Sequence, residues 1–302
     1  MDTMVAQDNI KTSFIFNIML KAAQITPPRL ASWMIHRFAD FSMLRHRQSD
    51  HIKAMTANQK IIHQGKLSPQ ELKRIVRRTL INRVYFQYEL YHHLHSFQHL
   101  YDQVTLSPNA AEYFNDPYAA MLVGPHLGNF DLMGWTIAKM IPHVQTISVA
   151  NPPLIYQLEN KYRAQAGIDV TPASINALSE AMHRLRAGKP VITGIERPFP
   201  DARYTPRFFG LPAALPDVHI RLALKAEVPV IVMAVLHQDD GSYRFEASKP
   251  IHMQTNASHD IEIIHNAEVV LKAAENLILN APDQWFMFYP VWPETLEPHS
   301  YR

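Results

Sequence analysis

Short apolar runs and helical segments alternate from Tyr118 to Asn280, and this alternation constrains the fold more than any other feature of the sequence. The pattern predicts strands near residues 118–123, 145–150, 190–195, 229–236 and 243–248. It predicts helices near residues 130–141, 153–166, 174–188, 217–227 and 260–280. Such alternation is typical of an α/β protein, so we expect a largely parallel central sheet with helices on its faces.

The part of the chain before this alternation has its apolar residues at helical spacing. Apolar residues from Phe14 to Ala22 share one helical face, and Pro27 with Pro28 ends that helix and opens another. The second helix carries Trp33 among several arginines. An amphipathic helix of this kind can lie in a membrane interface, and the alternative is an ordinary helical cap on the core.

We therefore expect two regions joined in one integrated domain. Residues 1–105 form a helical, membrane-associating region, and residues 106–302 form the α/β core. The most apolar N-terminal run, from Phe14 to Ile25, contains polar residues and is shorter than the roughly 20 apolar residues that cross a bilayer. It also lacks the basic start and the cleavage site of a signal peptide.

A strong helix start occurs at Ser68, with Pro69 at the first helical position and Glu71 at the third. The helix that follows is rich in basic residues, which are Lys73, Arg74, Arg77, Arg78 and Arg83. Three of them, Arg74, Arg77 and Arg78, share one face. This face either holds the phosphates of a lipid or carrier protein, or is a solvated basic surface.

Three histidines near the end of the same helix, His92, His95 and His99, also share a face and suggest a metal site. Zinc sites usually add a cysteine or carboxylate ligand and supporting hydrogen bonds. We therefore interpret these residues as surface histidines.

A glycine-containing turn joins the strand predicted at 118–123 to the helix that follows it. Gly124 and Gly128 provide the backbone freedom for a tight turn, so His126 should lie just past the carboxyl end of a strand, where α/β sheets place their ligands. Asp131 falls in the first turn of the helix. Its carboxylate can fold back onto one imidazole nitrogen and leave the other free as a base. The alternative is a turn histidine satisfied by a helix-capping aspartate.

A second pair of ionisable residues follows the buried strand predicted at 190–195. Glu196 and Arg197 should emerge at the same edge of the sheet as His126. Ionisable residues in that place favour a functional role, and the alternative is a structural ion pair.

The loop after this pair contains Arg207, followed by Phe208 and Phe209. Arginine suits phosphate groups because its planar fork matches them. The two aromatic rings either line an acyl channel or pack under the sheet.

Composition excludes several chemistries. The 302 residues contain no cysteine, which excludes disulfides, thiolate metal sites and a cysteine acyl-enzyme. The formal net charge of +2 is too near neutral to indicate a nucleic-acid partner. The sequence has neither the glycine-rich phosphate loop of nucleotide-binding proteins nor the Gly-x-Ser-x-Gly elbow of α/β-hydrolases.

The string from His126 to Asp131 resembles the His-four residues-Asp signature of glycerolipid and lipid A acyltransferases. More specifically, it resembles the lipid A biosynthesis acyltransferase branch, which includes phosphatidylinositol mannoside acyltransferases. Four further blocks resemble that family in the same order: Asn151-Pro152 with Asn160 to Arg163, Gly194 to Arg197 with Pro206 to Gly210, Val228 to Ile231, and Pro282 to Trp285. Two features depart from the family pattern, because Glu196-Arg197 replaces an Arg-Asp pair and Phe286 to Pro290 replaces a segment with His and Arg.

This resemblance implies an O-acyltransferase that moves a fatty acyl chain from a thioester, acyl-CoA or acyl-carrier protein, to a hydroxyl of a lipid or glycolipid. His126 would be the general base, Asp131 would orient it, and Glu196 would position the acceptor or support His126. Residues in the matching blocks would bind substrate: Gly128, Asn129, Arg163, Arg197, Arg207, Phe208 and Phe209. We expect no metal and no cofactor, since a thioester donor needs neither.

We expect the protein to act peripherally at the cytoplasmic face of the inner or plasma membrane. Its partners would be the acyl donor, including acyl-carrier protein, the lipid acceptor and the membrane surface, with no nucleic acid. Two alternatives stay open, a hydrolase of thioesters or lipids and a non-catalytic lipid-binding relative. The presence of His126, Asp131 and Glu196 together argues against the second.

Overall fold

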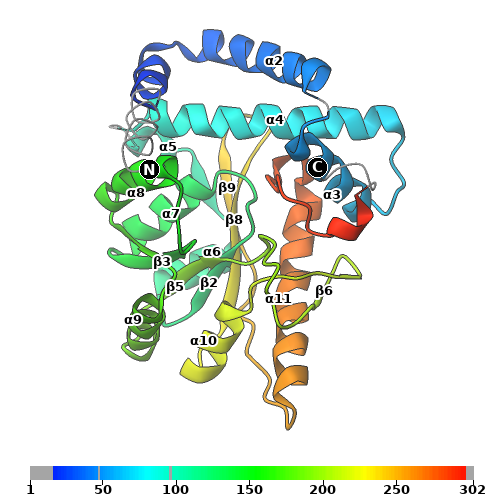
Figure 1. Cartoon of the computed structure of the whole chain (residues 1–302). Helices are drawn as coiled ribbons and strands as arrows, with labels where there is room; N and C mark the ends of the chain where they lie inside the picture. Colours follow the sequence, from blue (N-terminus) through cyan, green and yellow to red (C-terminus); the bar gives the residue numbers. More distant parts are fainter. Residues whose placement is uncertain (1–15, 47, 95–96, 297–302) are drawn as a thin grey trace, which may run out of the picture.

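The computed structural model describes residues 16–46, 48–94 and 97–296 (Figure 1). Besides a helical stretch over residues 16–25, its helices are α2 (Pro28–Arg45), α3 (Asp50–Ile62), α4 (Pro69–His92), α5 (Gln98–Tyr101), α6 (Pro108–Asn115), α7 (Phe130–Met140), α8 (Leu154–Gln165), α9 (Ile175–Arg186), α10 (Val218–Ala226) and α11 (His259–Asn280). Short 3-10 turns follow at η1 (Pro282–Gln284) and η2 (Pro293–Thr295). The strands are β1 (Val104–Leu106), β2 (Met121–Gly124), β3 (Val144–Ser148), β4 (Ile168–Pro172), β5 (Val191–Gly194), β6 (Arg207–Phe208), β7 (Leu211–Pro212), β8 (Val230–His237) and β9 (Tyr243–Ala247).

Seven strands form one central sheet in the order β1-β9-β8-β2-β5-β3-β4, and β6 with β7 forms a separate small hairpin. The pairs from β8 through to β4 are all parallel. Strand β9 runs antiparallel to β8, and β1 is parallel to β9. This confirms the predicted α/β fold with a largely parallel sheet.

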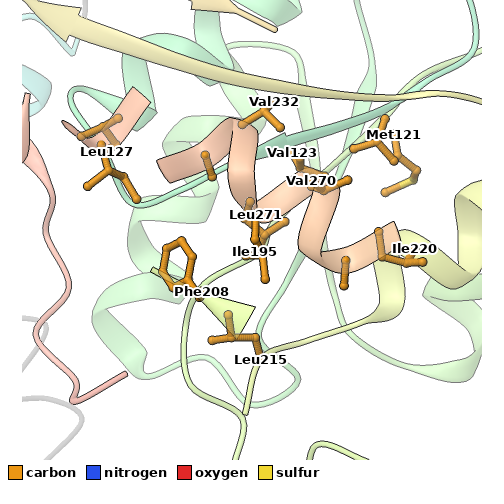
Figure 2. Close-up of a cluster of buried hydrophobic side chains, with 14 of the residues drawn as sticks. Met121, Val123, Leu127, Ile195, Phe208, Leu215, Ile220, Val232, Val270 and Leu271 are labelled. Atoms are coloured by element: carbon orange, nitrogen blue, oxygen red, sulfur yellow. The ribbon is translucent and has the colours of Figure 1, made fainter. Parts of the chain in front are cut away.

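Both faces of the sheet are covered, which explains why its central strands are almost entirely apolar. Met121 and Val123 of β2 belong to a cluster shared with α9, α10 and α11, whereas Leu122 belongs to a second cluster shared with α6 and α7. Figure 2 shows part of the first cluster, where Phe208 and Leu271 lie beside Ile195. The strands therefore have a fixed register, and their carboxyl ends are held at one edge of the sheet.

Helix α4 crosses that edge, and α2 lies along α4 on the side away from the sheet (Figure 1). The predicted start of α4 is confirmed, because Ser68 and Glu71 form a capping box and Pro69 occupies the first turn. Two of the five basic residues predicted on α4 form ion pairs: Arg77 with Asp40 of α2 at 2.6 Å and Arg78 with Asp283 at 2.8 Å. These contacts fix the N-terminal helices onto the core.

The sequence pattern located every strand it predicted to within a few residues. It missed β1, β4, the two-residue strands β6 and β7, and the helix α6 between β1 and β2. Strand β4 is short, ends in proline and is half-exposed, so its apolar signal is weak. The boundary that we place at residue 105 falls within β1, which pairs with β9 of the core.

No helix in the described ranges is long and apolar enough to cross a membrane. Among the same residues, no group of three or more histidine, aspartate or glutamate side chains could hold a metal ion. The rings of His92, His93 and His99 lie near one another, and His95 lies outside the described residues.

His219 of α10 should make the stability of the folded protein depend on pH. It is fully buried, and neither ring nitrogen has a hydrogen-bond partner among the described residues. Burial lowers its pKa to about 4, from the usual value of about 6.5. As pH falls below about 6.5, the unfolded chain binds a proton that the folded protein excludes, so the free energy of unfolding should fall by about 3 kcal/mol by pH 4.

Replacing His219 by leucine should therefore flatten the loss of stability between about pH 6.5 and pH 4, as measured by urea unfolding across that range. Burial also lowers the pKa of His63 and His237, so some pH dependence should persist. The exposed His252→Leu is the matched control and should leave the wild-type curve unchanged. Equal slopes for wild type and His219→Leu would contradict this account.

Candidate active site

His126 lies where the sequence predicted, two residues beyond the carboxyl end of β2 and four residues before α7. Its imidazole is 36% exposed, so one edge of the ring faces solvent. The backbone of the turn is held on two sides. His126 O accepts a hydrogen bond from Phe286 N at 2.7 Å, and Gly128 N donates to Gln284 O at 2.9 Å. The segment after α11 therefore fixes the position of the histidine.

The backbone conformation at position 128, and the close approach of β8, require a glycine there. Its φ is +64°, and a Cβ at this position would lie 1.9 Å from the carbonyl oxygen of Val235 in β8. The N–H of Gly128 is used by Gln284, and the N–H of Asn129 donates to the same Val235 carbonyl at 2.8 Å. Both N–H donors are occupied within the protein, so neither is free for the substrate binding expected of Gly128 and Asn129.

Glu196 is the carboxylate that contacts His126. The parallel register of β2 and β5 pairs Gly124 with Gly194, and His126 and Glu196 each follow two residues later. The fully buried Oε1 of Glu196 lies 3.0 Å from His126 Nδ1 and also accepts the backbone N–H of His126. Trp285 Nε1 donates to the same oxygen at 3.3 Å. Strand pairing thus brings together two residues that are 70 apart in sequence.

Several groups hold Glu196 in its ionised form. Burial alone would raise the pKa of this carboxyl, but the charge of His126 and the hydrogen bonds from its ring and backbone together lower the pKa below the usual value. An ionised Glu196 accepts the proton of Nδ1–H, which leaves Nε2 of His126 as the unprotonated nitrogen.

Asp131 does not contact His126, and this corrects the predicted pairing. Its Oδ1 accepts a hydrogen bond from Arg163 Nε of α8 at 2.7 Å. Arg163 also donates to Asn160 Oδ1 at 2.7 Å and to Glu159 Oε2 at 3.4 Å. Because the first turn of α7 directs Asp131 towards α8, it joins the two helices, and Arg163 is neutralised rather than free to bind phosphate.

Asn129 connects the turn to α4 through a buried carboxyl that the sequence did not reveal. Its Oδ1 caps α7 by accepting the N–H of Leu132, and its Nδ2 donates to Glu89 Oε2 at 3.5 Å. Tyr243 also donates to Glu89 Oε2. Burial raises the pKa of Glu89 to about 7, although hydrogen bonds from Tyr243, Tyr85 and Asn129 act in the opposite direction. Nothing in the sequence around Glu89 indicated this role.

Arg83 of α4 packs against the ring of Phe130, the first residue of α7. Its guanidinium carbon lies 6.0 Å from the ring centre of Phe130, and the Phe130 ring is edge-on to His126 with centres 6.0 Å apart. Within residues 16–46, 48–94 and 97–296, Arg83 forms no salt bridge, in contrast to Arg77 and Arg78 of the same helix. Arg83 and His126 thus both lie against the Phe130 ring.

Of the remaining predicted residues, Phe208 and Phe209 pack against Trp285 and the two arginines lie elsewhere. Phe208 is fully buried between the rings of Trp285 and Trp292, so it packs beneath the site and does not line an open channel. Phe209 follows it and donates its N–H to Glu275 of α11. Arg197 stacks on Tyr289 and donates to its hydroxyl at 3.0 Å. The side chain of Arg207 is exposed at the start of the β6–β7 hairpin.

Together, the fold and the site define an α/β protein that presents an oriented histidine at the carboxyl ends of two parallel strands. The sequence profile of the family described as bacterial lipid A biosynthesis acyltransferase matches residues 3–294. The chain therefore belongs to this acyltransferase family, as the ordered sequence blocks predicted. A comparison with curated proteins gave no match.

Proposed function

We propose that the protein is an O-acyltransferase that moves a fatty acyl chain from a thioester to a hydroxyl of a lipid or glycolipid. The observation that carries this proposal is the His126 ring, with Nδ1 bonded to buried Glu196 and its other edge open to solvent. Exposed Gly194 keeps that edge open, because even a Cβ there would lie only 3.5 Å from His126 Cε1. The family membership supports the same class of reaction.

In the proposed reaction, Nε2 of His126 takes the proton of the acceptor hydroxyl as its oxygen attacks the thioester carbonyl carbon. The tetrahedral intermediate then loses the thiolate by cleavage of the carbon–sulfur bond, and the imidazolium returns its proton to the sulfur. Glu196 holds the tautomer and stabilises the imidazolium. The steps balance without a metal or an oxidant.

We assign the anion-binding role expected of Arg163 to Arg83 instead, because Arg163 is paired with Asp131 and Arg83 forms no salt bridge in the described chain. A guanidinium against the Phe130 ring, which also packs against His126, can hold a phosphate of the donor or acceptor. Arg207 and Arg197 lie on the loop after Glu196 and are the candidates for the far end of the substrate.

The reaction is tested by measuring thiol release from palmitoyl-CoA and from palmitoyl-carrier protein, with and without a lipid or glycolipid acceptor. We expect release that depends on the acceptor and appearance of the acylated product by mass spectrometry. Release without acceptor would indicate the hydrolase, and no release from either donor would indicate the non-catalytic relative. Comparison of the two donors identifies the carrier.

We further propose that α2 docks the protein peripherally on the cytoplasmic face of the membrane. Exposed apolar side chains follow one face of the first two helices: Ile18, Met19, Ile25, Leu30, Trp33, Met34, Phe38, Phe41 and Leu44. Trp33 is 61% exposed and Leu44 83% exposed, although both are apolar. Arg29, Arg37 and Arg45 accompany them on α2. Such a helix fits a lipid interface with an anionic surface.

The double substitution Trp33→Ser with Phe41→Ser should weaken binding to anionic vesicles at least about tenfold, because burial of a large apolar side chain contributes about 1.5–3 kcal/mol. Flotation of the vesicles measures the bound fraction, and high salt should reduce it further. Ile175→Ser on α9 removes an equally exposed apolar side chain from another part of the molecule and is the control. Equal binding of the double variant and the control would exclude α2 as the docking surface.

A further inference from the structure

A hollow of about 420 Å³ lies where α2, α3 and the start of α4 meet, and none of its lining residues belongs to the candidate active site. Its volume falls in the range of about 300–1,000 Å³ that is usual for ligand sites. The floor is apolar and is formed by Met43, Leu67, Leu72 and Val76. Leu72 and Val76 are themselves buried in the small core that joins α3 to α4.

Two lysines from different helices border this apolar floor. Lys60 comes from the last turn of α3 and Lys73 from the first part of α4, and both are exposed. Neither forms a salt bridge with a carboxylate among the described residues, and the carboxylate of nearby Glu71 is occupied by its capping bonds to Ser68. The hollow therefore combines an apolar interior with two unpaired positive charges.

We propose that this hollow binds one anionic phospholipid, with an acyl chain on the apolar floor and the phosphate between Lys60 and Lys73. An uncharged lipid would leave both lysines without a counter-charge, and a purely polar anion would leave the floor unfilled. Met43, which lines the hollow, belongs to α2. The residue after it, Leu44, is among the most exposed apolar side chains of the protein. A protein held on a membrane by α2 thus has bilayer phospholipids at the edge of the hollow.

This site is separate from acyl transfer, because it does not use His126 or Glu196. A phospholipid bound in the hollow would make membrane binding depend on the identity of the lipid headgroup. Binding through the apolar face of α2 alone would depend only on the surface charge of the bilayer and not on which headgroup carries it. Occupation of the hollow would also hold α2, α3 and α4 together at one corner of the helical region. The ligand then contributes to the stability of that corner in proportion to its concentration and affinity.

The test uses the full chain and short-chain dihexanoyl phosphatidylglycerol below its micelle concentration, with titration calorimetry as the readout. We expect one phosphatidylglycerol per chain, and no binding of dihexanoyl phosphatidylcholine or glycerol 3-phosphate. Lys60→Gln with Lys73→Gln should weaken phosphatidylglycerol binding at least tenfold. Thr56→Phe, which fills the hollow without changing its charge, should do the same.

Lys189→Gln with Lys225→Gln makes the same change of charge at exposed positions on other elements and should bind like wild type. Thermal unfolding checks that every variant is folded. Equal binding by the two double-lysine variants would overturn the site. Unchanged binding by Thr56→Phe would show that only surface charge is involved, and tight binding of glycerol 3-phosphate would show a phosphate site rather than a lipid site.

Turnover of a water-soluble acceptor should be the same in wild type, the two double-lysine variants and Thr56→Phe. The outcome of the binding test is therefore independent of the proposed reaction.

Discussion

Replacing His126 by alanine is expected to lower acyl transfer by roughly two to four orders of magnitude, the usual contribution of a general base. Such a loss corresponds to about 3–5 kcal/mol of transition-state stabilisation. The turn itself should persist, because its position depends on backbone hydrogen bonds to Gln284, Phe286 and Val235 and not on the imidazole. Acceptor-dependent thiol release measures the effect.

His126→Gln separates the loss of the base from the loss of a partner for buried Glu196. A glutamine can donate a hydrogen bond towards Glu196 but cannot take the proton of a hydroxyl at neutral pH. Both variants should therefore be inactive, and the glutamine variant should melt closer to wild type. Turnover like that of wild type in either variant would remove His126 from the mechanism.

The second large effect is expected for Glu196→Gln, with turnover lower by roughly two to four orders of magnitude. The amide oxygen can still accept from the ring and backbone of His126 and from Trp285, so the shape of the site is kept. What is lost is the negative charge that stabilises the imidazolium. The new amide N–H₂ would replace Glu196 Oε2, which has no hydrogen-bond partner in the described structure, at a cost of about 1–3 kcal/mol in stability.

Asp131→Asn is the comparison that distinguishes the two carboxylates of the site. It removes the charge facing Arg163 and leaves that guanidinium with Glu159 as its carboxylate partner. We expect a loss of stability of about 1–3 kcal/mol and much smaller effects on turnover of the folded protein than in Glu196→Gln. If Asp131→Asn were the more severe change in specific activity, the sequence-based pairing of His126 with Asp131 would be restored.

The sequence predicted His126 and Glu196 because each follows a largely apolar strand, and the carboxyl ends of parallel strands share one edge. It did not predict that they touch, since this depends on β2 and β5 being neighbours with Gly124 opposite Gly194. Proximity in sequence suggested Asp131 instead. Five residues across a tight turn into a helix leave the direction of a side chain undetermined, and here it points to α8.

Other parts of the site had no local signal at all. Glu89 lies in a helix whose charges are mostly basic, and only its contacts with Asn129 and Tyr243 distinguish it from a surface glutamate. Arg83 could not be separated from its basic neighbours until the ion pairs of Arg77 and Arg78 were known. The exposed apolar face of α2, by contrast, was predictable, because helical spacing alone places Trp33 and its neighbours on one side.

The turn that carries His126 and the segment after α11 are joined by hydrogen bonds, and this has a consequence for the chain during its synthesis. His126 and Glu196 emerge from the ribosome well before Gln284, Trp285 and Phe286, which bond Gly128 N, Glu196 Oε1 and His126 O. A nascent chain therefore contains its proposed proton-transfer residues long before it contains the groups that hold them in place. If the proposed reaction holds, we expect acyl transfer only after the late segment is added, and we expect a chain shortened before Gln284 to be inactive although it keeps His126 and Glu196.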